Sequence, residues 1–91
     1  MEAVLNENLR PLFFNKFYFN PVTKNLNIEV NTALGNIEIY NSFGQHIADV
    51  RINKNENTLV YNAEHLSEGV YHLVLFQEGE IVEVDKILII R

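Results

Sequence analysis

The sequence predicts a single all-β domain, an antiparallel β-sandwich of about seven strands. Short runs of alternating apolar and polar residues recur about every ten residues along most of the chain, with turn-forming residues between them. The 91 residues show no apolar period long enough to predict a helix. A chain of this length is enough for one domain and too short for two.

The clearest alternation lies in residues 25–30, where Leu26, Ile28 and Val30 alternate with polar neighbours. Successive side chains of a strand point to opposite faces, so this segment is expected to have one buried and one solvated face. Ile37 and Ile39 repeat the pattern in the next strand. Further strands are expected at residues 12–19, 45–52, from 59 onward, 70–77 and 80–91.

Turn residues separate these strands. Asn41-Ser42-Phe43-Gly44 is the strongest hairpin signal, and residues 66–69 and 78–79 are further turns. In the strand after Gly44, Ile47 is out of phase with Val50 and Ile52, which predicts a β-bulge near Ala48-Asp49. The strand at 70–77 is apolar on both faces and is therefore expected to be central. Residues 1–11 lack periodicity and are interpreted as a linker, with the domain spanning 12–91.

Composition excludes several classes of function. The net charge is −5 and the basic residues are scattered, so neither nucleic acid nor an anionic membrane surface is an expected partner. The apolar run 87–90 is far too short to span a bilayer, so membrane insertion is not expected. The chain has no cysteine, which rules out disulfides and thiolate metal sites. An apolar fraction of 47% argues against disorder.

No catalytic or metal-binding constellation is expected. His46, His65 and His72 lack the spacing of short metal motifs, and no hydroxyl residue lies in a nucleophile-elbow pattern. The acidic group around the last hairpin does not match a calcium loop and is interpreted as a solvated face; it comprises Glu78, Glu80, Glu83 and Asp85. The phenylalanines in 13–19 are expected to fill the core or a cargo interface. Neither an enzymatic activity nor a cofactor is therefore predicted.

An ordered set of motifs resembles a known family. It comprises Phe19-Asn20-Pro21, then Ile37-Glu38-Ile39-Tyr40-Asn41 followed by Gly44, then Leu66-Ser67-Glu68-Gly69-Val70-Tyr71, and finally Lys86-Ile87-Leu88-Ile89-Ile90-Arg91. Over residues 17–91 this order resembles the C-terminal sorting domain, type A, of proteins exported by type IX secretion in Bacteroidota. Phe19 stands where the family usually has a first proline, which leaves the entry into that turn less constrained.

The resemblance implies an Ig-like sandwich that carries out no chemistry itself. It implies a cargo domain upstream, recognition by the translocation machinery of the outer membrane, and export through the periplasm to the cell surface or the extracellular space. A surface sortase then usually removes the domain and joins the cargo to a lipopolysaccharide anchor. The recognition residues that the resemblance assigns are Asn20, Pro21, Gly44, Gly69, Tyr71, Lys86 and Arg91.

The residues themselves leave other interpretations open. Gly69 and Tyr71 suit a structural role, with an unusual φ at the glycine and a buried ring whose hydroxyl reaches the rim. Lys86 shares its phase with Val84, Leu88 and Ile90, so it either presents a charge to a partner or protects a sheet edge. A stand-alone adhesion or carbohydrate-binding module, and a small periplasmic β-sandwich of another role, remain alternatives to a sorting domain.

Overall fold

The computed structural model describes residues 13–54 and 56–90. These residues form seven β-strands and no helix, which confirms the predicted all-β class. A helix long and apolar enough to cross a membrane is therefore absent from this part of the chain. The strands are β1 (Phe14–Asn20), β2 (Asn25–Val30), β3 (Asn36–Asn41), β4 (His46–Arg51), β5 (Thr58–Asn62), β6 (Gly69–Gln77) and β7 (Glu80–Ile89).

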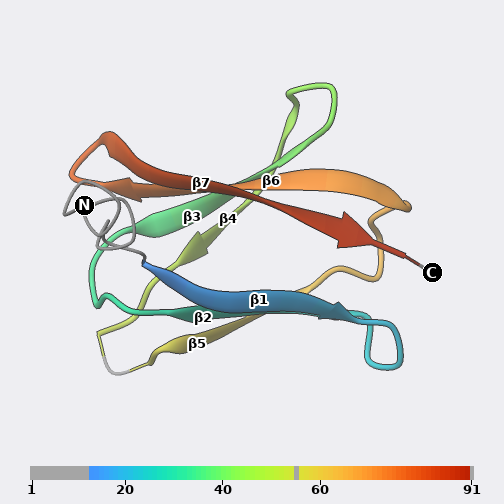
Figure 1. Ribbon diagram of the computed structural model, residues 1–91, viewed down its shortest axis with the longest axis horizontal. Coiled ribbons are helices and arrows are strands. Elements are labelled where there is room, and N and C mark those ends of the chain that lie inside the picture. The colour runs from blue at the N-terminus through green and yellow to red at the C-terminus, as the bar shows by residue number, and fades with distance from the viewer. Residues whose placement is uncertain (1–12, 55, 91) are drawn as a thin grey trace, which may run out of the picture.

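The strands form two antiparallel sheets that face each other (Figure 1). One sheet has three strands in the order β1-β2-β5, and the other has four in the order β4-β3-β6-β7. β6 lies between β3 and β7, which confirms that the strand predicted at 70–77 is central. β7 is an edge strand of its sheet, so one side of its backbone has no strand partner within the sheet.

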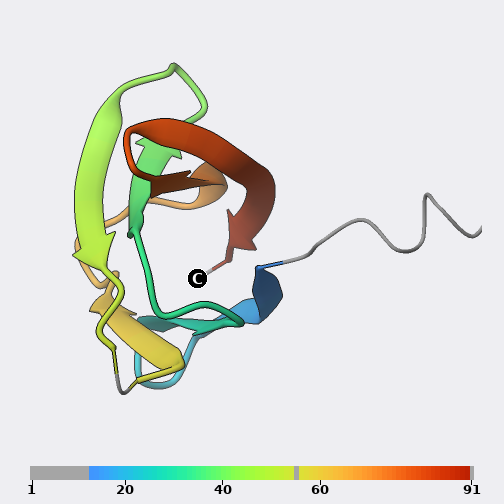
Figure 2. The ribbon, with the colours of Figure 1, turned by 90° about the vertical axis from the view of Figure 1, so that its left-hand side faces the viewer.

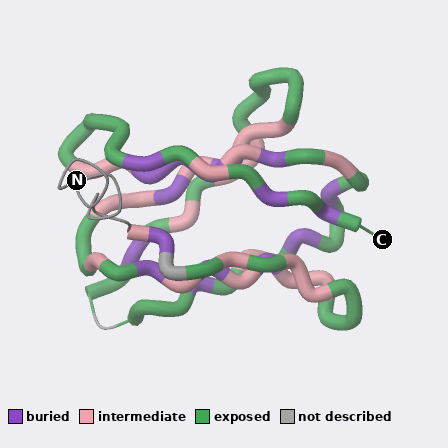
Figure 3. The backbone as a smooth tube through the Cα atoms, in the orientation of Figure 1, coloured by how far each residue is buried: buried purple, intermediate pink, exposed green. Residues whose placement is uncertain are grey.

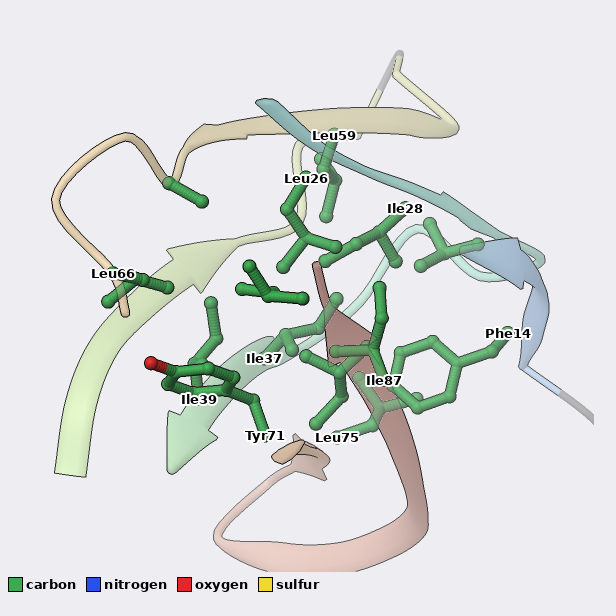
Figure 4. Close-up of a cluster of buried hydrophobic side chains, with 14 of the residues drawn as sticks. Phe14, Leu26, Ile28, Ile37, Ile39, Leu59, Leu66, Tyr71, Leu75 and Ile87 are labelled. Atoms are coloured by element: carbon green, nitrogen blue, oxygen red, sulfur yellow. The ribbon is translucent and has the colours of Figure 1, made fainter. Parts of the chain in front are cut away.

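The core lies between the sheets and follows the alternation seen in the sequence (Figure 3). Leu26 and Ile28 of β2 and Ile37 and Ile39 of β3 are fully buried, as predicted. Figure 4 shows these side chains meeting residues from both sheets, so the apolar rows of the strands interdigitate. The other fully buried large residues are Val30, Leu73, Leu75 and Ile89.

The aromatic residues of the first strand contribute to this core. Phe14 is buried, and Phe17 and Phe19 are partly buried against the same cluster. The rings of Phe14 and Phe17 meet edge to face with centroids 5.8 Å apart, an arrangement that the quadrupoles of aromatic rings favour. These phenylalanines fill the core, as expected, and do not form an exposed platform for stacking against sugars.

Register shifts interrupt the strand ladders at defined points. In β4, His46 pairs with Tyr40 while Ala48 pairs with Ile39, so Ile47 is the extra residue. The predicted bulge of this strand is thus confirmed, with Ile47 rather than Ala48-Asp49 as its centre. In β7, Ile81 pairs with Phe76 and Glu83 with Leu75, which leaves Val82 as the extra residue of a second bulge. Such bulges increase local twist and bend the strand.

Viewed along its length, the sandwich is curled rather than flat (Figure 2). The edge strands β4 and β7 curve from the four-stranded sheet toward the three-stranded sheet. The start of β1 thereby lies next to β7, although the two strands belong to different sheets. The segments at the two ends of the described chain therefore meet at one side of the sandwich.

Candidate recognition surface

The outward face of the β6–β7 hairpin is largely apolar and exposed. The antiparallel register pairs Val70 with Leu88 and Val74 with Val84. Val70, Val84 and Leu88 are exposed, whereas Val74 is only 8% exposed, and all four side chains alternate with the inward residues of the same strands. We define the hairpin outer face as Val70, His72, Val74 and Phe76 of β6 with Ile81, Val84, Lys86 and Leu88 of β7.

The exposure of this face is greatest along the edge strand. The exposed fractions are 59% for Ile81, 52% for Val84 and 55% for Leu88. Ile90, just beyond β7, is 59% exposed. Single apolar residues at a surface are ordinary, whereas a contiguous apolar row on a sheet edge marks either an interaction site or an aggregation hazard.

Lys86 lies in the middle of this apolar row, as its phase in the sequence predicts. It is exposed, it lies between Val84 and Leu88, and it faces His72 across the ladder. Within residues 13–54 and 56–90, no carboxylate oxygen lies within 4.0 Å of its ammonium group. The hairpin outer face therefore combines a wide apolar row with one central, unpaired positive charge.

The neighbouring half of the same sheet face is polar. Glu38 pairs with Asp49 and Tyr40 pairs with His46 across the β3–β4 ladder. The bulge at Ile47 puts His46 and Asp49 on one face, where His46 Nε2 lies 3.3 Å from Asp49 Oδ1. The Tyr40 hydroxyl donates to the Glu38 carboxylate, and this bond is the main cause that raises the pKa of Tyr40.

This polar cluster brings together three side chains that could ligate a metal ion. Donor atoms of Glu38, His46 and Asp49 lie within 4.8 Å of one another, but His46 and Asp49 are exposed. The other histidines lie elsewhere: His65 follows β5 and is 3.0 Å from the Tyr61 hydroxyl, and His72 is on β6, two strands from His46. The three histidines singled out in the sequence are thus not brought together.

The remaining motif residues are local structural elements at separate places in the fold. The Asn20 side chain accepts hydrogen bonds from the backbone N–H groups of Val22 (2.9 Å) and Thr23 (3.3 Å), which fixes the β1–β2 turn that begins at Pro21. Gly44 closes the β3–β4 turn by donating to the Asn41 carbonyl. Arg91, the last residue assigned by resemblance, lies outside the described residues.

Tyr71 anchors the connection that precedes β6. Its side chain is only 5% exposed, and its hydroxyl donates to the Ser67 carbonyl at 2.7 Å. Gly69, at the start of β6, has a φ of +153°. The buried ring and rim hydroxyl predicted for Tyr71 are therefore confirmed, and both residues shape the turn into the central strand.

Glu83 contradicts the interpretation of the acidic group as a solvated face. It is buried, with 6% exposure, whereas Glu78 and Glu80 are exposed and Asp85 is half-buried. Its Oε1 accepts hydrogen bonds from the backbone N–H of Phe13 at 2.6 Å and of Phe14 at 3.4 Å. The sequence contained one signal for this: Glu83 shares its phase with Ile87 and Ile89, the inward residues of β7.

Comparison with known proteins identifies a matching family. A sequence profile described as "Secretion system C-terminal sorting domain" matches residues 16–90. The matched region starts in β1 and ends directly after β7, so it includes nearly the whole sandwich and the hairpin outer face. A search of curated proteins gives no match.

Proposed function

Because the chain belongs to the family of secretion system C-terminal sorting domains, we propose that it directs an upstream cargo through type IX secretion and that the hairpin outer face is the surface read by the translocation machinery. Membership of the family implies a sorting signal, a cargo, and export across the outer membrane to the cell surface or beyond. The family is non-catalytic in general. The identity of the recognition surface is the new part of the proposal.

The observation that carries the proposal is the row of exposed apolar residues around Lys86. Edge protection accounts for the lysine but not for the exposed apolar residues on either side of it. Here its neighbours in the row, Val84 and Leu88, are each more than half exposed. Keeping such a row exposed is costly for a soluble domain, which favours a partner that covers it.

The chemistry of the face specifies the partner surface. Branched aliphatic side chains of β7 need an apolar surface to exclude water, and the Lys86 ammonium needs a carboxylate or carbonyl oxygen. Because β7 is an edge strand, a partner can also pair with its free backbone groups. We therefore expect the machinery to present an apolar surface with an acidic group opposite Lys86.

Removal of the domain after export is a second part of the proposed sorting function. We propose that a surface sortase removes the domain and joins the cargo to a lipopolysaccharide anchor. The boundary for this cleavage is expected before β1, because the family match starts at residue 16 and Phe14 already belongs to the core. Removal of β1 together with the rest of the domain leaves the cargo without the sandwich.

The test uses a reporter that carries a signal peptide at its start and residues 1–91 at its end, expressed in a bacterium with type IX secretion. Val84→Ser and Leu88→Ser are introduced together on the hairpin outer face. Val60→Ser is the matched control, because Val60 is 57% exposed on β5 of the other sheet. We expect the double variant to stay folded and to accumulate in the periplasm, while the control is exported like the unchanged fusion.

Two outcomes contradict the proposal at different levels. Export of the double variant at the same rate as the unchanged fusion would show that the translocation machinery does not recognise the hairpin outer face. Periplasmic retention of the unchanged fusion, folded and intact, would contradict the sorting function itself. Circular dichroism of each purified domain separates loss of recognition from loss of folding.

A further inference from the structure

The buried carboxylate of Glu83 joins the two ends of the described chain. It is the one charged side chain that is buried among residues 13–54 and 56–90. Its Oε1 is 2.6 Å from the backbone nitrogen of Phe13 and 3.4 Å from that of Phe14, residues 70 and 69 positions earlier in the chain. A carboxylate in this position is stable only because backbone donors replace the water it has lost.

Glu83 points inward because it alternates in phase with Ile87 and Ile89, the inward residues of β7. Val82 is the extra residue, and the ladder resumes with Glu83 opposite Leu75, which is fully buried. Glu83 thus lies on the inner face, while the next residue, Val84, lies on the outer face. One side of β7 contacts the start of β1, and the other side is the hairpin outer face.

The hydrogen bonds from Phe13 and Phe14 to Glu83 connect the two sheets at the point where the chain enters the domain. β1 pairs with β2 and has no ladder with β7. A register shift between Phe14 and Lys16 interrupts its pairing with β2 close to this point. The Phe13 N–H therefore depends on Glu83, rather than on the sheet, for the bond that the structure gives it, whereas the Phe13 carbonyl accepts a hydrogen bond from the Asn31 N–H at 2.6 Å.

We propose that Glu83 is a carboxylate latch that holds the start of β1 closed only while β7 is seated in the sandwich. A partner that draws β7 out of its sheet removes the acceptor from the Phe13 and Phe14 N–H groups and leaves the start of β1 without its side-chain tie to the four-stranded sheet. This inference rests on the proposed function in one respect, because it supposes a cargo upstream and a partner that binds β7. The junction between the cargo and the domain then becomes accessible only when the partner binds β7. The coupling is reciprocal, so a freed β1 also loosens β7.

The test measures amide hydrogen exchange by NMR on the purified chain, without any export. Glu83→Ala removes the acceptor, and Glu83→Gln keeps the shape with a neutral acceptor. Glu80→Ala is the matched control, since Glu80 is an exposed glutamate of the same strand. We expect exchange at Phe13 about ten-fold faster in Glu83→Ala, about three-fold faster in Glu83→Gln, and unchanged in the control.

The amides of Ile37 and Leu75, in the central strands, show whether the effect is local. In the folded Glu83→Gln variant their exchange is expected to stay within about two-fold of the unchanged chain. Equal acceleration at Phe13 and Leu75, or no change at Phe13 in either variant, would overturn the latch. Trypsin cleavage after the exposed Lys16 of β1 is a second measurement, expected to be faster in Glu83→Gln than in Glu80→Ala.

Failure of the latch and failure of the sorting function give different results. The latch is tested by local amide exchange at Phe13 in the isolated domain. The sorting function is tested by export of the unchanged fusion. If the fusion is exported and the Glu83 variants show no faster exchange at Phe13, the sorting function is supported and the latch is contradicted.

Discussion

Replacing Tyr71 with phenylalanine tests whether the most recognisable motif of the chain is structural or is read by a partner. The substitution keeps the ring, which is 5% exposed, and removes the hydroxyl that donates to the Ser67 carbonyl at 2.7 Å. A hydrogen bond of this kind contributes about 0.5–1.5 kcal/mol. Because Ser67 is exposed, water can satisfy its carbonyl in the variant, so the expected loss is about 1 kcal/mol.

This loss is small compared with the stability of the domain. A chain of 91 residues has a free energy of unfolding of roughly 5–14 kcal/mol, so Tyr71→Phe remains folded and can be tested for export. Tyr71→Ala, in contrast, removes a buried ring and is expected to cost about 3–5 kcal/mol. The graded pair separates the contribution of the hydroxyl from that of the ring.

Urea denaturation followed by circular dichroism measures both variants. Tyr18→Phe is the control, because Tyr18 is 48% exposed and its expected change is within about 0.5 kcal/mol. If Tyr71→Phe is as stable as the unchanged chain, the hydroxyl does not make the bond described. If it is folded and yet retained in the periplasm, Tyr71 is read directly, and the structural assignment is wrong.

Two further predictions concern the turns and the polar half of the sheet. Gly35→Ala puts a Cβ into the Phe76 carbonyl at a φ of +111°, and we expect the free energy of unfolding to fall by about 3 kcal/mol. Gly79→Ala is the control, because Gly79 has a φ of +80° with open space around it, and its free energy of unfolding should fall by only about 1 kcal/mol. Equal losses of the two variants in urea denaturation would refute the overlap between the Cβ and the Phe76 carbonyl. Glu38→Gln weakens the acceptor that raises the pKa of Tyr40, so this phenol should ionise at lower pH in an ultraviolet titration. Since the folded pKa is raised, the stability from this bond is present below about pH 10 and is lost as pH rises through the folded value; an unchanged titration of Tyr40 would contradict the bond.

The alternation of the sequence was sufficient to predict the strands and their buried faces where one face is polar. Leu26 and Ile28 in β2 and Ile37 and Ile39 in β3 are inward as expected, because their neighbours in the strand are polar. The central position of β6 followed from its apolar residues on both faces. The turn at Asn41–Gly44 followed from residues whose side chains bond their own backbone, as Asn41 does with Phe43 and Gln45.

The last strand shows where such patterns are insufficient. β7 is apolar in both phases near its end, so periodicity alone does not decide which row is buried. Pairing with β6 decides it: Glu83 and Ile87 lie opposite the buried Leu75 and Tyr71 and face the core, whereas Val84 and Leu88 face outward. The phase of Glu83 matches that of the inward Ile87 and Ile89, but its charge and its acidic neighbours predict a solvated position, because the backbone donors of Phe13 and Phe14 that permit its burial come from the other end of the chain.

The residues that the resemblance assigns to recognition could be listed from the sequence but not arranged in space. Asn20 and Gly44 lie in different turns, and Tyr71 is buried. Of the described residues assigned by resemblance, Lys86 is the one placed on the hairpin outer face, and the apolar residues around it were not assigned. Their grouping depends on the β6–β7 register, which joins positions 14 and 18 residues apart, as in His72 with Lys86 and Val70 with Leu88.

Secretion of the reporter by the complete domain tests the central claim most directly. The fusion to residues 1–91 is expressed in a strain with type IX secretion and in the same strain without its translocation machinery, and the fraction of reporter outside the cell is measured. We predict that reporter appears outside only in the first strain. Equal retention of a folded, intact fusion in both strains would contradict the claim.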